Sequence, residues 1–172
     1  HIQSVDKYYG DYHALRDINL DVPDGQTLVI CGPSGSGKST LIRCINGLET
    51  YASGTVEVLG LAVGDDRHLC NLVRKQVGMV FQNFNLFPHQ TILENCVLPQ
   101  IRAIGKDRAA ATEEALSQLA KMQVQEHVDK YPDQLSGGQR QRAWLAMALS
   151  QETQIMLLDE HTTYLDIAHQ VE

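Results

Sequence analysis

Two glycine-rich stretches of this chain have the residue types and spacing needed to bind phosphate. The first reads GPSGSGKST over residues 32–40 and matches the pattern G-x-x-x-x-G-K-[ST]. Its glycines leave backbone N–H groups open to an anion, Lys38 would reach the β and γ phosphates, and the Ser39 hydroxyl would bind Mg²⁺. Taken alone, the motif predicts only that the chain binds a nucleoside triphosphate, and the sequence has no N-K-x-D guanine reader.

The second stretch, LSGGQRQR over residues 135–142, has the pattern of a helix start. Ser136 and Gln139 have the spacing of a capping box, in which each side chain bonds to the other residue's backbone N–H. Gly137 and Gly138 leave the first N–H groups of this helix uncovered, and such an end attracts anions. An isolated S-x-x-Q could be a capped helix and nothing more, but the full motif following KYPDQ favours a second phosphate-seeking surface.

Two acids follow an apolar run in IMLLDE, residues 155–160. A buried strand delivers such acids to the carboxyl edge of the sheet, where ligands bind in open α/β folds. Asp159 would hold Mg²⁺, through water, and Glu160 would orient and deprotonate the attacking water. The alternative is a strand end that enters solvent.

These motifs need a scaffold in which strands alternate with helices, and the apolar pattern predicts one. The predicted strands are residues 2–5, 18–22, 27–31, 56–58, 78–82 and 155–158, of which 27–31 and 155–158 are expected to be buried on both faces. Three helices are predicted. One begins near Leu41 and ends around Gly47, and the other two cover residues 107–124 and 139–149. In the helix over residues 107–124, Asp107 is the expected N-cap, and the apolar face is formed by Ala115, Leu116, Leu119 and Met122. The fold class is therefore α/β with a parallel central sheet.

Composition excludes several classes of function. The 172 residues carry a formal net charge of −7 and scattered basic residues, which argues against nucleic acid as a partner. No apolar run approaches the ~18 residues needed to cross a bilayer and no signal peptide opens the chain, so we expect a cytosolic or peripheral protein. Four cysteines without a C-x-x-C pair predict reduced, mostly buried thiols and no zinc site.

The three motifs, in this order, resemble the nucleotide-binding domain of the ATP-binding cassette (ABC) family across nearly the whole chain. The resemblance implies a P-loop NTPase fold with a mainly parallel central sheet, an N-terminal antiparallel β portion and a helical subdomain. It also implies a single, incomplete domain over residues 1–172. Residues 1–82 and 154–172 would form the ATP-binding core, and residues 83–153 the helical subdomain with the signature motif.

The resemblance implies roles for individual residues. The ATP-binding set is Tyr9, Ser34, Gly35, Ser36, Gly37, Lys38, Ser39 and Thr40. Tyr9 matches the ring that stacks on adenine, although Tyr8 could be that ring instead. Gln82 matches the glutamine that senses Mg²⁺ and the attacking water. The expected metal ligands are therefore Ser39, Gln82 and Asp159. The expected catalytic residues are Glu160, Lys38 and Gln82. Asp166 matches an acid that contacts the partner domain, with a plain solvated aspartate as the alternative.

Partners also follow from the resemblance. Two such domains pair head to tail, so that Ser136, Gly137, Gly138 and Gln139 of one copy face the ATP of the other. The stretches CGPSGSGKSTLIRCINGLE and VFQNFNLFPHQTILENC look like ATPase subunits of bacterial polar amino-acid importers. Such a subunit lies on the cytoplasmic side of the membrane, binds permease subunits and serves a solute-binding protein indirectly. In the FNLFPH loop, Phe84, Leu86 and Phe87 are either core or a partner-facing patch.

Some positions depart from the family pattern. His161 stands where proline is usual, Tyr164 where a small residue is usual, and Met147 where arginine is usual. The switch histidine and the closing elements of the family are not reached, so we expect a fragment with weak hydrolysis. A nucleotide-binding module with little catalysis is therefore one alternative function. Another is a non-transport ABC-type ATPase, such as a DNA-repair or translation ATPase. DNA-repair ATPases of this type have a long coiled coil between the phosphate loop and the signature, and translation ATPases carry a second cassette. In this chain Lys38 and Ser136 are only 98 positions apart, and no heptad pattern lies between them.

Overall fold

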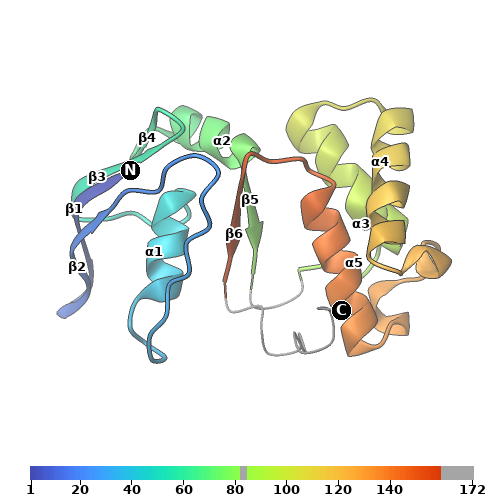
Figure 1. Ribbon diagram of the computed structural model, residues 1–172, viewed down its shortest axis with the longest axis horizontal. Coiled ribbons are helices and arrows are strands. Elements are labelled where there is room, and N and C mark those ends of the chain that lie inside the picture. Colours follow the sequence, from blue (N-terminus) through green and yellow to red (C-terminus); the bar gives the residue numbers. More distant parts are fainter. Residues whose placement is uncertain (82–84, 160–172) are drawn as a thin grey trace. The chain divides into compact units, whose positions relative to one another are not determined.

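The computed structural model of this protein describes residues 1–81 and 85–159. The chain divides into two compact units, His1–Val77 and Gly78–Glu172. Helices and strands are labelled in Figure 1.

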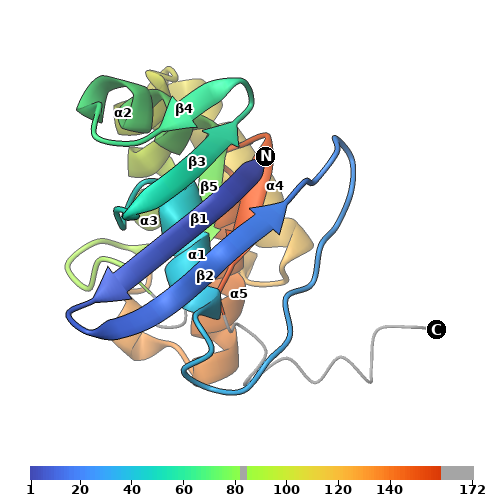
Figure 2. The same ribbon diagram turned by 90° about the vertical axis from the view of Figure 1, so that its left-hand side faces the viewer.

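The first unit is built on an antiparallel sheet in the order β2-β1-β3-β4. Its strands are β1 (Ile2–Tyr9), β2 (Tyr12–Leu20), β3 (Ser53–Val58) and β4 (Leu61–Val63). Helix α1 (Lys38–Ile45) lies behind this sheet in Figure 2, and α2 (Arg67–Gln76) packs beside β4. The predicted N-terminal antiparallel portion is confirmed, as are the expected strands at residues 2–5, 18–22 and 56–58, within the usual uncertainty of element ends.

Side chains from one face of the sheet and from both helices form the core of the first unit. Its buried members include Ile2, Val5, Leu15, Leu41, Cys44, Val56, Val63, Cys70 and Val73. Helix α1 buries Leu41 and Cys44, and it ends before Gly47, whose φ of +67° is left-handed, as the sequence predicts. The tight packing there also favours glycine, because a Cβ on Gly47 would lie 3.0 Å from the Cys70 Sγ.

The prediction of a doubly buried strand at residues 27–31 is wrong for this structure. The turn before it forms as expected, with Gln26 N donating to Pro23 O at 3.3 Å. Residues 27–31 themselves are not in a strand, and Leu28 and Val29 expose 48% and 76% of their surface. A strand exists only where a neighbour completes its hydrogen-bond ladder. None of the described strands pairs with this segment, so apolar composition alone does not make it part of a sheet.

The second unit contains two paired strands and a helical layer. The strands β5 (Val77–Val80) and β6 (Ile155–Leu158) run in the same direction in Figure 1. The helices are α3 (Ile92–Pro99), the π-helix η1 (Gln100–Ile104), α4 (Arg108–Lys121) and α5 (Gly137–Leu149), with two 3₁₀ turns, η2 (Gln125–His127) and η3 (Pro132–Gln134). Strand β6 is only partly buried and Leu158 is 42% exposed, so the expectation of full burial is wrong. A two-stranded ladder leaves more of each strand uncovered than the centre of a wider sheet does.

Helices α3, α4 and α5 enclose the core of the second unit. Trp144, Ile92 and Leu119 are its largest fully buried side chains. Helix α4 begins at the predicted N-cap, since the Asp107 carboxylate accepts from Ala109 N at 2.9 Å. Leu116 was expected on the apolar face of α4 but is 41% exposed, because α3 and α5 cover the narrower stripe of α4 that carries Leu119.

Candidate functional site

The phosphate-loop motif folds around its own lysine. The Lys38 ammonium donates to the carbonyl oxygens of Gly32 and Pro33, each at 2.9 Å. Helix α1 begins at this lysine, and no side chain caps its N-terminus. Its first turn also contains no acidic residue. A cationic side chain at an uncapped helix start is an arrangement that favours an anion.

Two glycines of the loop have left-handed backbones. Gly35 has a φ of +81° and Gly37 a φ of +91°. A Cβ on Gly37 would lie 2.7 Å from the Ala14 carbonyl oxygen, so β2 passes directly against the loop. Any side chain at residue 37 would therefore push the loop off β2 as well as strain the backbone.

Tyr12, at the start of β2, binds the phosphate loop. Its hydroxyl donates to the Gly35 carbonyl oxygen at 3.0 Å across 23 positions of sequence. Sequence reasoning missed this contact. The sequence KYYGDY contains three tyrosines, of which Tyr12 is the third, but the sequence pattern does not indicate which ring reaches the phosphate loop.

The β1–β2 hairpin carries three exposed tyrosines, of which Tyr12 reaches the loop. Tyr8 stacks on the His13 ring, with centroids 4.1 Å apart and planes 15° apart. Tyr9 is 45% exposed, and the Lys7 Nζ lies 4.8 Å from its ring centroid. His13 therefore occupies one face of Tyr8 and Lys7 one face of Tyr9, so both rings stay candidates for the stacking role. That role is still a prediction.

A carboxylate of β1 links this strand to its neighbours β2 and β3. Asp6 accepts hydrogen bonds from Asp17 N (3.1 Å), His13 Nε2 (2.7 Å) and Ser53 Oγ (3.1 Å). These bonds, led by the Asp17 N–H, lower the pKa of Asp6 below its ordinary value of 3.8. Because Asp17 has a left-handed φ of 44°, the carboxylate stabilises a backbone conformation that aspartate adopts only at a cost.

The signature motif forms the capping box that its sequence predicts. The Gln139 N–H donates to Ser136 Oγ at 3.3 Å, and the Ser136 N–H donates to the Gln139 side-chain oxygen at 2.9 Å. A Cβ added to Gly137 would meet no atom within 4 Å, and one added to Gly138 would meet only the flexible end of Arg142, at 3.9 Å. Unlike Gly37, these two glycines meet nothing in the described part of the chain that requires glycine.

The acidic motif is only partly described. Asp159 follows β6, is 2% exposed, and its N–H donates to the Val80 carbonyl oxygen at 2.9 Å, which extends the β5–β6 pairing by one residue. Gln82, Glu160, His161, Tyr164 and Asp166 lie outside the described residues. The structure places the phosphate loop with Tyr9 in the first unit, and the signature with Asp159 in the second.

The loop before α3 is fixed by one buried side chain. Asn95, fully buried, donates from its amide to the carbonyls of Phe87, Gln90 and Thr91 and accepts from Phe87 N at 2.7 Å. Leu86 packs against the helical core, whereas Phe87 is 47% exposed. Leu86 is thus part of the core, a partner-facing role for the exposed Phe87 stays a prediction, and Phe84 lies outside the described residues.

Met147, which departs from the family pattern, is a core residue. It is 9% exposed and packs among the side chains of the α3–α4–α5 core. An uncharged, flexible side chain suits that position.

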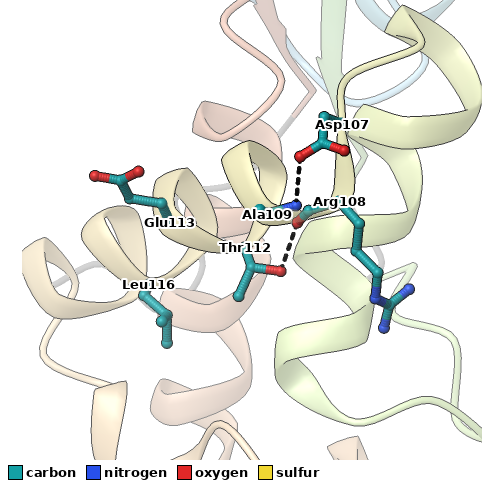
Figure 3. Close-up of a pocket in the computed structure, with 6 residues that line it drawn as sticks. All are labelled: Asp107, Arg108, Ala109, Thr112, Glu113 and Leu116. Atoms are coloured by element: carbon teal, nitrogen blue, oxygen red, sulfur yellow. Dashed lines mark hydrogen bonds between the residues drawn. The ribbon is translucent and has the colours of Figure 1, made fainter.

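An open depression of about 830 Å³ lies along α4, and its lining contains none of the motif residues. Figure 3 shows Asp107, Arg108, Ala109, Thr112, Glu113 and Leu116 around it. Three of its polar groups already have protein partners, since Thr112 Oγ1 donates to Arg108 O, Asp107 caps Ala109 N and the Arg108 guanidinium pairs with Glu94 of α3. The depression therefore offers no set of converging polar groups to a ligand.

The residues of the first unit fit a polyphosphate, whereas the three predicted magnesium ligands are not all described within one unit. Ser39 and Asp159 belong to separate units, and Gln82 is not described. Across residues 1–81 and 85–159, no cluster of three or more His, Cys, Asp or Glu side chains could hold a metal ion. Among the helices of those same residues, none has both the length and the apolar composition to cross a bilayer.

Solved structures of ATP-binding cassettes share this fold. The cassette MJ0796, solved as a dimer in a post-hydrolysis state bound to ADP and Pi, matches with a TM-score of 0.86 and 36% sequence identity. The match covers 96% of this chain and 75% of that chain. A second dimeric structure of MJ0796, described as a bacterial ABC transporter cassette, matches with a TM-score of 0.87 over 97% of this chain and 76% of that one, again at 36% identity. The predicted α/β cassette fold is confirmed.

The ABC transporter family matches residues 15–163, and the chain belongs to this family. It is 51% identical to the general L-amino acid transport ATP-binding protein AapP of Rhizobium johnstonii, over 96% of this chain and 64% of that protein. It is 46% identical to the glutamine transport ATP-binding protein GlnQ of Bacillus subtilis (95% and 68% covered). It is also 46% identical to the glutamate/aspartate import ATP-binding protein GltL of Escherichia coli (96% and 68% covered). The chain thus spans about two thirds of the length of these relatives.

Proposed function

We propose that this chain is the ATP-binding part of a subunit that hydrolyses ATP to energise a membrane importer for polar amino acids. The observation that carries the proposal is the α5 N-terminus. Its capping box is complete, yet Gly137 and Gly138 leave open space that nothing in the described chain needs. Two glycines in a first helical turn are unfavourable relative to alanine, so a ligand from outside the chain explains them.

The phosphate loop supplies the other half of the argument. Lys38 and the N-terminus of α1 would hold the β and γ phosphates, with Ser34, Gly35, Ser36, Gly37 and Thr40 around them and Tyr9 stacked on the adenine ring. Ser39, with Gln82 and Asp159, would bind Mg²⁺, which neutralises phosphate charge when bound. Glu160 would take the proton of the attacking water. We assign residues 1–82 and 154–172 to this ATP-binding core and residues 83–153 to the helical subdomain.

Pairing follows from having two phosphate-seeking helix starts in one chain. Ser136 and the N–H groups of Gly137 and Gly138 in one copy would contact the γ-phosphate held by Lys38 of the other, with Asp166 at the contact between copies. Loss of the γ-phosphate removes the shared ligand and allows the pair to open. Permease subunits on the membrane would convert this cycle into transport, and an external solute-binding protein would deliver the substrate. The match to relatives named for amino-acid transport supports this assignment, with the subunit lying peripherally on the cytoplasmic side.

Separate measurements of ATP binding and ATP turnover in the full protein test this proposal. Lys38→Ala should abolish ATP binding, because it removes the cation of the loop. Lys75→Ala is the matched control, since Lys75 is an exposed lysine of α2 outside the loop, and it should bind ATP as the parent does. Glu160→Gln should retain ATP while its turnover falls by about 10²–10⁴.

Two results would contradict the proposal in different ways. A parent protein that binds ATP without measurable turnover would be a nucleotide-binding module. Equal ATP affinity in the Lys38→Ala variant and the parent would remove the phosphate loop from the mechanism.

A further inference from the structure

The signature helix is bonded to a histidine from another part of the second unit. The Gln139 side-chain nitrogen lies 2.8 Å from His127 Nε2, although the two residues are 12 positions apart. His127 ends the 3₁₀ turn η2 and lies outside the signature motif.

Hydrogen-bond chemistry gives this contact its direction. The Gln139 side-chain oxygen accepts from Ser136 N, so the oxygen side of the amide faces the helix cap and its NH₂ group faces His127. An amide NH₂ can only donate, and therefore His127 Nε2 accepts. In a neutral imidazole that accepts at Nε2, the proton is on Nδ1.

The other side of the ring is left without a bond. His127 Nδ1 is buried and has no hydrogen-bond partner among the described residues. A buried N–H without a partner disfavours the folded state, and an apolar side chain of similar size would avoid that penalty. Fold stability alone therefore does not explain a histidine at this position.

His127 is held by the backbone around it. Its N–H donates to Val124 O at 3.0 Å. The residues that follow are bonded to the start of α3, where Leu93 N donates to Val128 O at 3.0 Å and Ile92 N donates to Lys130 O at 2.9 Å. The imidazole is thus a fixed acceptor against which the Gln139 amide is oriented.

We propose that His127 is a positioning residue for the signature motif. By binding the Gln139 amide, it keeps that side chain on the Ser136 N–H and away from the N–H groups of Gly137 and Gly138. Those groups then stay open to the phosphate of a second copy. The proposal rests on the function proposed above, and it adds a residue outside the motif on which pairing depends.

Two substitutions separate positioning from a structural role. His127→Leu fills the space but cannot accept a hydrogen bond. His127→Gln keeps an acceptor near the position of Nε2. Both are made in full-length protein carrying Glu160→Gln, so that hydrolysis does not disperse the pair. The melting temperature, the ATP affinity of the monomer and the protein concentration at half-maximal ATP-dependent pairing are measured for each.

The His127→Leu variant should melt at or above the parental temperature and bind ATP with unchanged affinity. Its pairing should need about fivefold more protein, the equivalent of one lost hydrogen bond. The His127→Gln variant should pair within about twofold of the parent. Pairing of His127→Leu at the parental concentration would overturn the proposal. So would a fall in its melting temperature that His127→Gln shares, because that pattern indicates a structural role.

Nitrogen-15 spectra of the histidine ring provide a readout that does not depend on ATP. The protonated nitrogen should be Nδ1, and a proton on Nε2 would overturn the assigned contact. A parent protein that binds ATP but never pairs would contradict the proposed function, whereas a pairing parent with the wrong tautomer would contradict only the role of His127.

Discussion

Replacing Gly137 with alanine should make the protein more stable and less active. Among the described residues, no atom beyond the helix's own backbone and its chain neighbours lies within 4 Å of a Cβ at this position, so the change creates no clash. Glycine in the middle of a helix is less favourable than alanine by about 0.5–1 kcal/mol, and this sets the upper limit of the gain at Gly137, the first residue of α5. For a chain of this length, that limit corresponds to a rise in melting temperature of at most about 4 °C.

The same methyl group should block pairing. In the proposed complex, the Gly137 N–H lies against the phosphate held by the other copy, and a Cβ would occupy the approach path. ATP-dependent pairing and turnover should therefore fall by at least about tenfold, while ATP binding by the monomer is unchanged. Calorimetry of the melt and ultracentrifugation with saturating Mg-ATP measure the two effects on one sample.

Two other glycines are controls for this experiment. Gly64→Ala changes an equally open site, whose nearest neighbour is the Tyr51 hydroxyl at 3.9 Å, and should alter neither stability nor pairing. Gly54→Ala should lower the melting temperature. Its Cβ would lie 2.3 Å from the Ser4 carbonyl oxygen, and residue 54 has a left-handed φ of +88°. If Gly137→Ala pairs and hydrolyses ATP as the parent does, the open glycines do not serve a partner's phosphate. If it melts lower than the parent, the helix start is not as described.

The remaining predictions concern pH and thiol chemistry. Asp6→Asn should lower the melting temperature at pH 7. Since folding lowers the pKa of Asp6, its contribution is present above the ordinary value of 3.8 and is lost as pH falls through the lower folded value, so parent and variant should converge in acid melts. Burial raises the pKa of the Cys44 thiol to about 11 and that of Cys96 to about 12, so neither should react with a maleimide at pH 8 until urea unfolds the chain. Mass spectrometry of labelled peptides checks this, and rapid labelling of Cys96 in the folded protein would contradict its burial.

The starts of two helices were predictable because their causes are local. Asp107 caps the N–H of the residue two positions later, and the two residues of the Ser136–Gln139 box are three positions apart, so each depends on side chains close in sequence. The end of α1 before Gly47 is similar, because a left-handed residue closes a helix wherever it occurs.

Burial was less predictable, because it depends on what covers a segment. Leu116 has the spacing of a core residue, but the neighbouring helices cover a narrower stripe of α4. Residues 27–31 have a strand's composition without a described neighbour to pair with, and Leu158 is 42% exposed at the end of a two-stranded ladder. Periodicity shows which side chains can be buried, whereas packing decides which ones are.

The sequence by itself determined the motifs, their order and the family, because residue type and spacing specify what a glycine loop, a capped helix start or a pair of acids can bind. The tertiary structure alone decided that Tyr12 holds the phosphate loop through Gly35 and that His127 orients Gln139. Those pairs are 23 and 12 positions apart. Contacts at such separations exist only after strands and helices have packed, and no local pattern specifies the partner.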